Sequence, residues 1–176
     1  MSRSKIILAT LTAAVVLVGV ALWAFQPWRL VTSSEIDQAA PVSEPRDSPT
    51  TTPASGDPSP TPRDKVLATG RFEDAEHATS GSVRLIELAD GRRFVRLEGL
   101  ASSDGPDLHV WLSDQPSGGE WGSYDDGRYA ALGLLKATHG NHNYEVPADI
   151  DLRAMRSVVI WCDRFNVAFG TAPVTA

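Results

Sequence analysis

The sequence predicts an all-β fold for the C-terminal part of the chain, either an antiparallel β-sandwich or a small β-barrel. From residue 65 onward, short apolar runs alternate with turn residues, and long segments with a period of about 3.6 residues are missing. The pair Asp90-Gly91 separates two such runs, which is a strong signal for a β-hairpin. Residues 107–113 alternate between aliphatic and other side chains, as in a strand with two different faces.

The expected strands follow one another along the chain. In order, they are 66–72, 82–88, 93–98, 107–113, 129–135, 143–146, 157–163 and 166–170. A single helical turn is expected at 151–155, with Asp151 as its N-cap. The run Val158-Val159-Ile160-Trp161 is apolar at both parities, which predicts a central strand covered on both faces.

The N-terminal segment predicts a membrane anchor. Residues 6–25 carry no charge, and a helix of this length spans ~30 Å, the thickness of the hydrocarbon core of a bilayer. Arg3 and Lys5 precede this run, so the positive-inside rule places the N-terminus in the cytoplasm and the C-terminal domain outside it. A cleaved signal peptide is the alternative, but it requires a shorter apolar region and small residues at the cleavage site.

The middle segment has a different composition. Residues 31–64 are rich in proline, serine and threonine and contain no aromatic residue, which predicts a disordered linker. The expected organisation is therefore 1–30 as cytoplasmic tip and transmembrane helix, 31–64 as linker and 65–176 as the β domain. The net charge of −6 argues against nucleic acid as a partner.

Cys162 is the only cysteine of the chain. It has the parity of Val158 and Ile160, so its side chain is expected on the same face as these two aliphatic residues. A lone cysteine commonly packs as a small hydrophobic residue. Outside the cytoplasm, however, an unpaired thiol is at risk of oxidation, which favours a chemical role. Both interpretations stay open.

The histidines give weak metal signals. His139 and His142 have a spacing that, together with Cys162 and a carboxylate, can complete a tetrahedral zinc site, but a solvated loop is the preferred interpretation. His109 is expected to be half-buried in its strand, and His77 to lie in a surface turn. The sequence contains no nucleophile elbow, phosphate loop or paired-cysteine haem attachment, so no classical enzyme is predicted.

Six sequence blocks, taken in order, carry a family resemblance. They are Gly70-Arg71-Phe72, His77-x-Thr79-Ser80-Gly81, Gly105 to Leu112, Leu132-Gly133-x-Leu135-Lys136, Asn143-Tyr144-x-Val146-Pro147 and Ser157 to Ala172. Together they resemble the DM13 family, the electron transfer DM13 domain, over about residues 70–173. One position departs from the family pattern, since His142 stands where members usually have glutamine.

The resemblance implies an extracytoplasmic all-β module whose cysteine, at Cys162, carries redox work as a bare thiol or with a prosthetic group such as haem. A thiolate at this position can ligate haem iron or a soft metal ion. The residues expected near the thiol, as members of a cofactor site, are His77, Asp107, His109, Lys136 and Tyr144. A redox partner protein is implied as well.

A non-catalytic binding module is the second hypothesis. Trp111, Trp121 and Tyr124 belong to or border the polar segment 114–127, and aromatic faces in such loops can stack on sugars. The ligand is then an envelope polysaccharide or a protein. Exposure of Trp121 favours this hypothesis, whereas burial favours a role in anchoring the loop.

Overall fold

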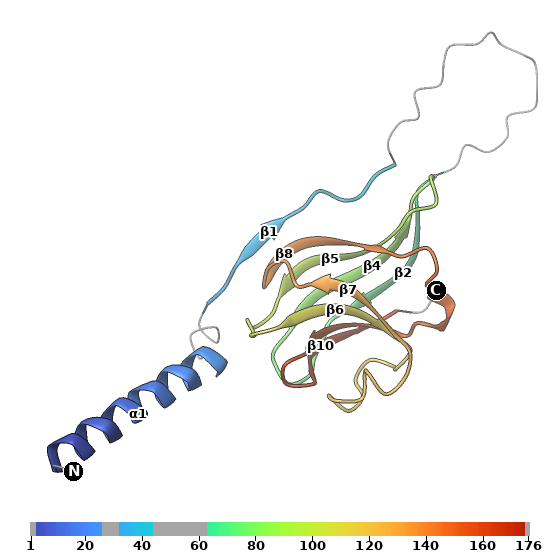
Figure 1. Ribbon diagram of the computed structural model, residues 1–176. Coiled ribbons are helices and arrows are strands. Elements are labelled where there is room, and N and C mark those ends of the chain that lie inside the picture. Colours follow the sequence, from blue (N-terminus) through green and yellow to red (C-terminus); the bar gives the residue numbers. More distant parts are fainter. Residues whose placement is uncertain (1–2, 26–31, 44–62, 175–176) are drawn as a thin grey trace, which may run out of the picture.

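The structure is a computed structural model that describes residues 3–25, 32–43 and 63–174. The helix α1 (Arg3–Phe25) projects away from the β domain (Figure 1). Among the described residues, no helix has both the length and the apolarity needed to cross a membrane. The anchor therefore stays a prediction, and the flanking residues 26–31 lie outside the described ranges.

The β domain is a sandwich of two five-stranded sheets and not a closed barrel (Figure 1). One sheet has the order β1-β8-β5-β4-β2, made of β1 (Glu35–Asp37), β8 (His139–Val146), β5 (Arg93–Ala101), β4 (Ser80–Glu87) and β2 (Lys65–Arg71). The other has the order β3-β10-β9-β6-β7, made of β3 (Glu73–Asp74), β10 (Val167–Pro173), β9 (Ser157–Cys162), β6 (Leu108–Ser113) and β7 (Tyr129–Leu134). All paired strands are antiparallel except β1 and β8.

The main core lies between the sheets and is built from alternate residues of each strand. Fully buried members are Val83, Val95, Leu97, Val110, Leu112, Val158, Ile160 and Cys162. A second cluster covers the outer face of β6, β9 and β10, and consists of Trp111, Tyr124, Val159, Trp161 and Ala168. Every residue of β9 is buried, so the prediction of a central strand covered on both faces is confirmed.

Local signals in the sequence identify most elements. The hairpin between β4 and β5 turns through Gly91, whose φ of 89° lies in the left-handed region that glycine tolerates. The expected helical turn is the 3-10 helix η2 (Leu152–Ala154), in which the Asp151 side chain accepts a hydrogen bond of 3.1 Å from the backbone N–H of Arg153. Strand β8 begins at His139 instead of residue 143, because β5 extends to Ala101 and pairs with it there.

Residues 32–43 fall within the segment predicted as a disordered linker, but they lie along the edge of the first sheet (Figure 1). Strand β1 pairs in parallel with the start of β8. The side-chain oxygen of Gln38 accepts a hydrogen bond of 2.8 Å from the backbone N–H of Asn143. The difference has a physical reason, since an edge strand such as β8 presents unpaired backbone groups. The remaining residues, 44–62, lie outside the described part of the chain.

Candidate functional site

Cys162 is the last residue of β9, and its side chain lies in the main core. It is fully buried and pairs with Leu108 at the start of β6. A tight turn over residues 163–166 follows, in which Asn166 has a φ of 54°. The backbone N–H of Asp163 donates a 3.0 Å hydrogen bond to the carbonyl of Asp107, which ties this turn to the start of β6.

The electrostatics around Cys162 favour the neutral thiol. Burial raises the pKa of Cys162 above its ordinary value, because the surrounding core disfavours a thiolate. Backbone hydrogen bonds from Phe165, Arg164 and Asp107 oppose this rise in pKa, while the charge of the Asp107 carboxylate adds to it. The net shift is upward, so the sulfur keeps its proton at neutral pH. A nucleophilic role, which needs the thiolate, is not supported.

The residues expected beside the thiol are divided among separate places. The backbone of Asp107 lies close to Cys162, and the Asp107 carboxylate contacts His109, which lies on the same outer face two residues further along the chain. Lys136 and Tyr144 are engaged with each other: the Tyr144 hydroxyl accepts a 3.0 Å hydrogen bond from the backbone N–H of Lys136, and its ring lies 4.8 Å below the Lys136 ammonium group.

His77 does not behave as a simple surface residue, because its ring packs 4.0 Å from the ring of Phe169. Phe169 in turn belongs to the main core. The residue lies in the bend after β3, as expected for a turn, but its imidazole forms part of the edge of the core.

The interpretation of His139 and His142 as members of a solvated loop is wrong, since both belong to β8. His142 is fully buried, and one ring nitrogen lies 3.1 Å from the carbonyl oxygen of His139. Burial lowers the pKa of His142, and the charge of Lys136 lowers it further. The His139 ring is engaged with the Thr138 hydroxyl at 2.9 Å. Each imidazole therefore has a structural partner of its own.

A different group has the composition of a metal site. The Nε2 atom of His109 lies 3.0 Å from Oδ1 of Asp107 and 3.4 Å from Oδ2 of Asp163. Within the described ranges, these three residues are the group of ligand-type side chains that lie close enough to hold an ion. The sequence pattern did not identify Asp163 as a site residue. It directly follows β9, and the pairing of β9 with β6 brings it beside His109.

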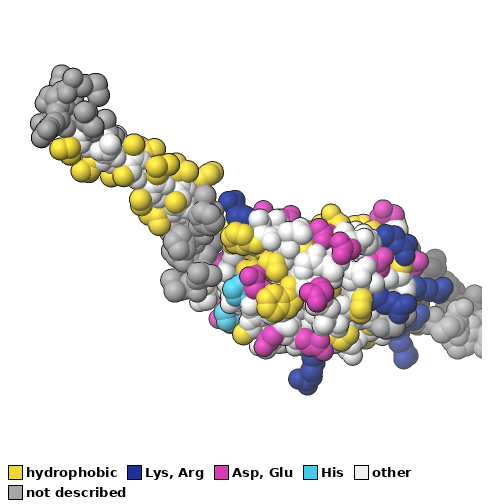
Figure 2. All heavy atoms as spheres, turned by 90° about the horizontal axis from the view of Figure 1, so that it is seen from below, with side chains coloured by type: hydrophobic (Ala, Val, Ile, Leu, Met, Phe, Trp, Pro, Cys, Tyr) yellow, Lys and Arg dark blue, Asp and Glu magenta, His cyan; other side chains and the backbone are white. Residues whose placement is uncertain are grey.

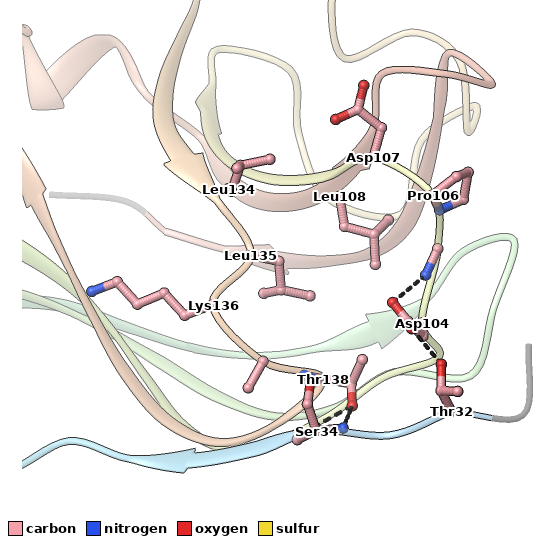
Figure 3. A pocket seen from close by; sticks show the side chains of 12 residues that line it. Thr32, Ser34, Asp104, Pro106, Asp107, Leu108, Leu134, Leu135, Lys136 and Thr138 are labelled. Carbon is pink, nitrogen blue, oxygen red and sulfur yellow. Dashed lines mark hydrogen bonds between the residues drawn. The ribbon is translucent and has the colours of Figure 1, made fainter. Parts of the chain in front are cut away.

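Haem ligated by Cys162 does not fit this arrangement. An open groove lies at the end of the domain where Leu108 pairs with Cys162, and it has a volume of about 660 Å³. Cys162 is not among the residues that line this groove. Leu108 and Leu135 form an aliphatic wall of the groove, while Thr32, Ser34 and Asp104 form a polar one (Figure 3). The Asp107 carboxylate points away from this aliphatic wall (Figure 3). The sulfur instead faces the packed core.

Three aromatic side chains form a continuous stack on the outer face of the second sheet. The rings of Tyr129 and Trp111 lie 4.2 Å apart with an interplanar angle of 11°, and those of Trp111 and Trp161 lie 4.7 Å apart at 25°. Tyr129 is 46% exposed, whereas both tryptophans are buried. The Trp111 indole N–H is buried without a hydrogen-bond partner in the described structure. This aromatic stack thus connects the surface with the strand that carries Cys162.

The fold and site define a two-sheet β-sandwich with a buried thiol at the end of its central strand. The family described as Electron transfer DM13 matches residues 71–174, and the chain belongs to this family. Comparison with curated proteins gave no match, and comparison with solved structures gave none either. Membership confirms the resemblance seen in the sequence and supports a redox role, whereas the part played by Cys162 stays a prediction.

The raised pKa of Cys162 predicts slow alkylation of the folded chain. At pH 8, iodoacetamide should react with Cys162 in the native full-length chain several-fold more slowly than in the urea-unfolded chain, because the sulfur is fully buried and its raised pKa leaves less thiolate. Reactivity should rise only at pH values above those at which an ordinary thiol ionises. Equal rates in the native and unfolded chains contradict this prediction. Mass spectrometry of the alkylated peptide measures both rates.

Proposed function

We propose that this chain is a membrane-anchored, extracytoplasmic redox module that transfers single electrons and in which Cys162 changes oxidation state. The observation that carries the proposal is the aromatic stack Tyr129–Trp111–Trp161, which runs from an exposed ring to the residue that precedes Cys162. Membership of the DM13 family supports electron transfer as the general activity.

Burial of the sulfur favours electron transfer over thiol–disulfide exchange. Exchange requires that a thiolate attacks a sulfur atom of the partner, so the two atoms have to touch. Cys162 is fully buried and its pKa is raised, which opposes both contact and ionisation. An electron, in contrast, can pass between packed aromatic rings without exposure of the sulfur. The indole and phenol rings of the stack are readily oxidised, and neighbouring rings lie at van der Waals spacing.

One electron and one proton leave the Cys162 thiol in the proposed step. A one-electron acceptor protein at Tyr129 removes one electron from the stack. The oxidised state then passes from Tyr129 through Trp111 to Trp161. The Cys162 thiol reduces the oxidised Trp161 with one electron, releases its proton to solvent at the turn over residues 163–166, and remains as a thiyl radical. Return of one electron and of a proton restores the thiol.

The anchor fits this arrangement. We propose residues 6–25 as a single membrane-spanning helix with the N-terminus in the cytoplasm. The described chain resumes at Thr32, whose hydroxyl donates a 2.6 Å hydrogen bond to Asp104 beside the groove of Figure 3. An anchor attached there holds the Cys162 end of the sandwich toward the membrane. Tyr129 lies near the opposite end of β6, where it pairs with Ser113, and is open to a partner protein.

Photo-oxidation tests the proposed electron path. The full-length chain is illuminated in air with tris(bipyridine)ruthenium(II) and persulfate, and the oxygen adduct at Cys162 is quantified by mass spectrometry, since dioxygen is small enough to enter a packed core. The wild type should form this adduct. Trp111→Phe and Tyr129→Phe should lower its yield several-fold, because a phenyl ring is far harder to oxidise than an indole or a phenol.

The matched control is Trp121→Phe, which removes an exposed indole that does not belong to the stack. Its adduct yield should equal that of the wild type. Thermal unfolding shows whether each variant keeps its fold, and Tyr129→Phe keeps the stacked ring. Equal yields in all four proteins, or no adduct at Cys162, would falsify the proposal.

A binding module for envelope polysaccharide or a protein is the second candidate function, and the exposure of Trp121 favours it. Its indole is 50% exposed, while its backbone carbonyl accepts a 2.8 Å hydrogen bond from the N–H of Ala168. The loop is thus fixed and its aromatic side chain open to solvent. Trp111 and Tyr124, which were grouped with it from the sequence, are buried and not available for stacking on a ligand.

Loss of the Trp121 side chain separates the two functions. Trp121→Ala should weaken retention of the chain on immobilised envelope polysaccharide if this loop binds sugar, because the exposed indole supplies the stacking face. The photo-oxidation yield at Cys162 should not change in this variant. Identical retention of wild type and variant at every loading removes the binding hypothesis for this loop.

A further inference from the structure

The cluster of Asp107, His109 and Asp163 lies at the end of the sandwich that holds Cys162. Their side chains are 40%, 20% and 42% exposed, respectively, so water and dissolved ions reach all three. On the face drawn in Figure 2, histidine and acidic side chains lie next to one another at the end of the domain nearer α1, and most of the lysine and arginine side chains visible there lie toward the other end.

Backbone pairing fixes the positions of these residues. His109 belongs to β6, Asp107 directly precedes that strand, and Asp163 directly follows β9. The pair Leu108 and Cys162 aligns the two strands at this end. The 3.0 Å hydrogen bond from the Asp163 N–H to the Asp107 carbonyl continues this alignment by one step. The three side chains therefore converge because strand pairing and this hydrogen bond hold the two turns beside each other.

We propose that Asp107, His109 and Asp163 bind a divalent first-row transition metal ion. Metal–nitrogen and metal–oxygen bonds of about 2.1 Å place neighbouring ligand atoms about 3.0 Å apart in an octahedron and about 3.4 Å apart in a tetrahedron. The distances from His109 Nε2 to the two carboxylate oxygens are 3.0 and 3.4 Å. All three ligand atoms lie within 4.8 Å of one another, so a small rotation of either carboxylate completes the set.

The donor set determines the class of ion. One imidazole nitrogen and two carboxylate oxygens form a mixed set that suits Mn²⁺, Fe²⁺, Zn²⁺ or Cu²⁺, whereas Ca²⁺ prefers an all-oxygen shell. This imidazole distinguishes the site from an ordinary group of surface carboxylates. Three protein ligands also leave coordination positions for water or a substrate.

The site lies at the inner end of the aromatic stack, because His109 is directly opposite Trp161 across β6 and β9. A redox-active ion held by His109 therefore has a path to Tyr129 through Trp161 and Trp111. Only this link rests on the proposed function. Metal binding itself does not.

Titration of the full-length, metal-free chain with Mn²⁺ tests the site, with the electron paramagnetic resonance signal of free Mn²⁺ as the readout. One ion should be bound per chain. Asp163→Asn and His109→Gln should each weaken binding at least about tenfold, because each removes one of only three protein ligands. Titration with Cu²⁺ should quench tryptophan fluorescence over the same 1:1 range, since Trp161 lies beside His109.

Asp149→Asn is the matched control, since it removes an exposed carboxylate in a different turn and should leave Mn²⁺ affinity unchanged. Asp163 is largely exposed, so its asparagine variant should keep the fold. No uptake of Mn²⁺, Zn²⁺ or Cu²⁺ at millimolar concentration, or equal affinity in all variants, overturns the site. Trp111→Phe distinguishes the two proposals, because it should lower Cys162 oxidation and leave metal affinity unaltered.

Discussion

The register between β6 and β9 is the constraint on which the rest of the site depends. The two strands pair from Leu108 with Cys162 to Ser113 with Ser157. Because side chains alternate along a strand, this register places Cys162, Val110 and Ile160 inside and His109, Trp111 and Trp161 outside. A slip by one residue would expose the thiol and bury the imidazole. The burial of both faces of β9 makes such a slip costly.

This register gives the two faces of one strand different properties. On the inner face, the packed core raises the pKa of the Cys162 thiol. On the outer face, Trp161 continues into a stack that ends at an exposed phenol. At the end of the strand, the turn after Cys162 delivers Asp163 to His109. A buried thiol, the aromatic stack and three side chains of the metal-ligand type thus meet at one end of β9, although they do not share one pocket.

Much of this could be predicted from the sequence, since alternation and turn residues are local signals. Eight of the ten described strands, the Asp90-Gly91 hairpin, the η2 turn and the faces of Cys162 and His109 follow from them, whereas the short edge strands β1 and β3 do not. Strand pairing is not local. Asp163 and Tyr129 are site residues because β6 lies between β7 and β9, which is a pairing that the sequence does not encode locally. His139 and His142 were misassigned because a polar strand, completed by pairing with β1, resembles a loop in sequence.

We propose that the aromatic stack and Cys162 exchange electrons across β9. Flash oxidation of the full-length chain, followed by time-resolved absorption of the tryptophan radical, tests it most directly. This radical should decay faster in the wild type than in Cys162→Ser, because the thiol returns an electron to Trp161 from the inner face. The same decay rate in the two proteins would contradict the account.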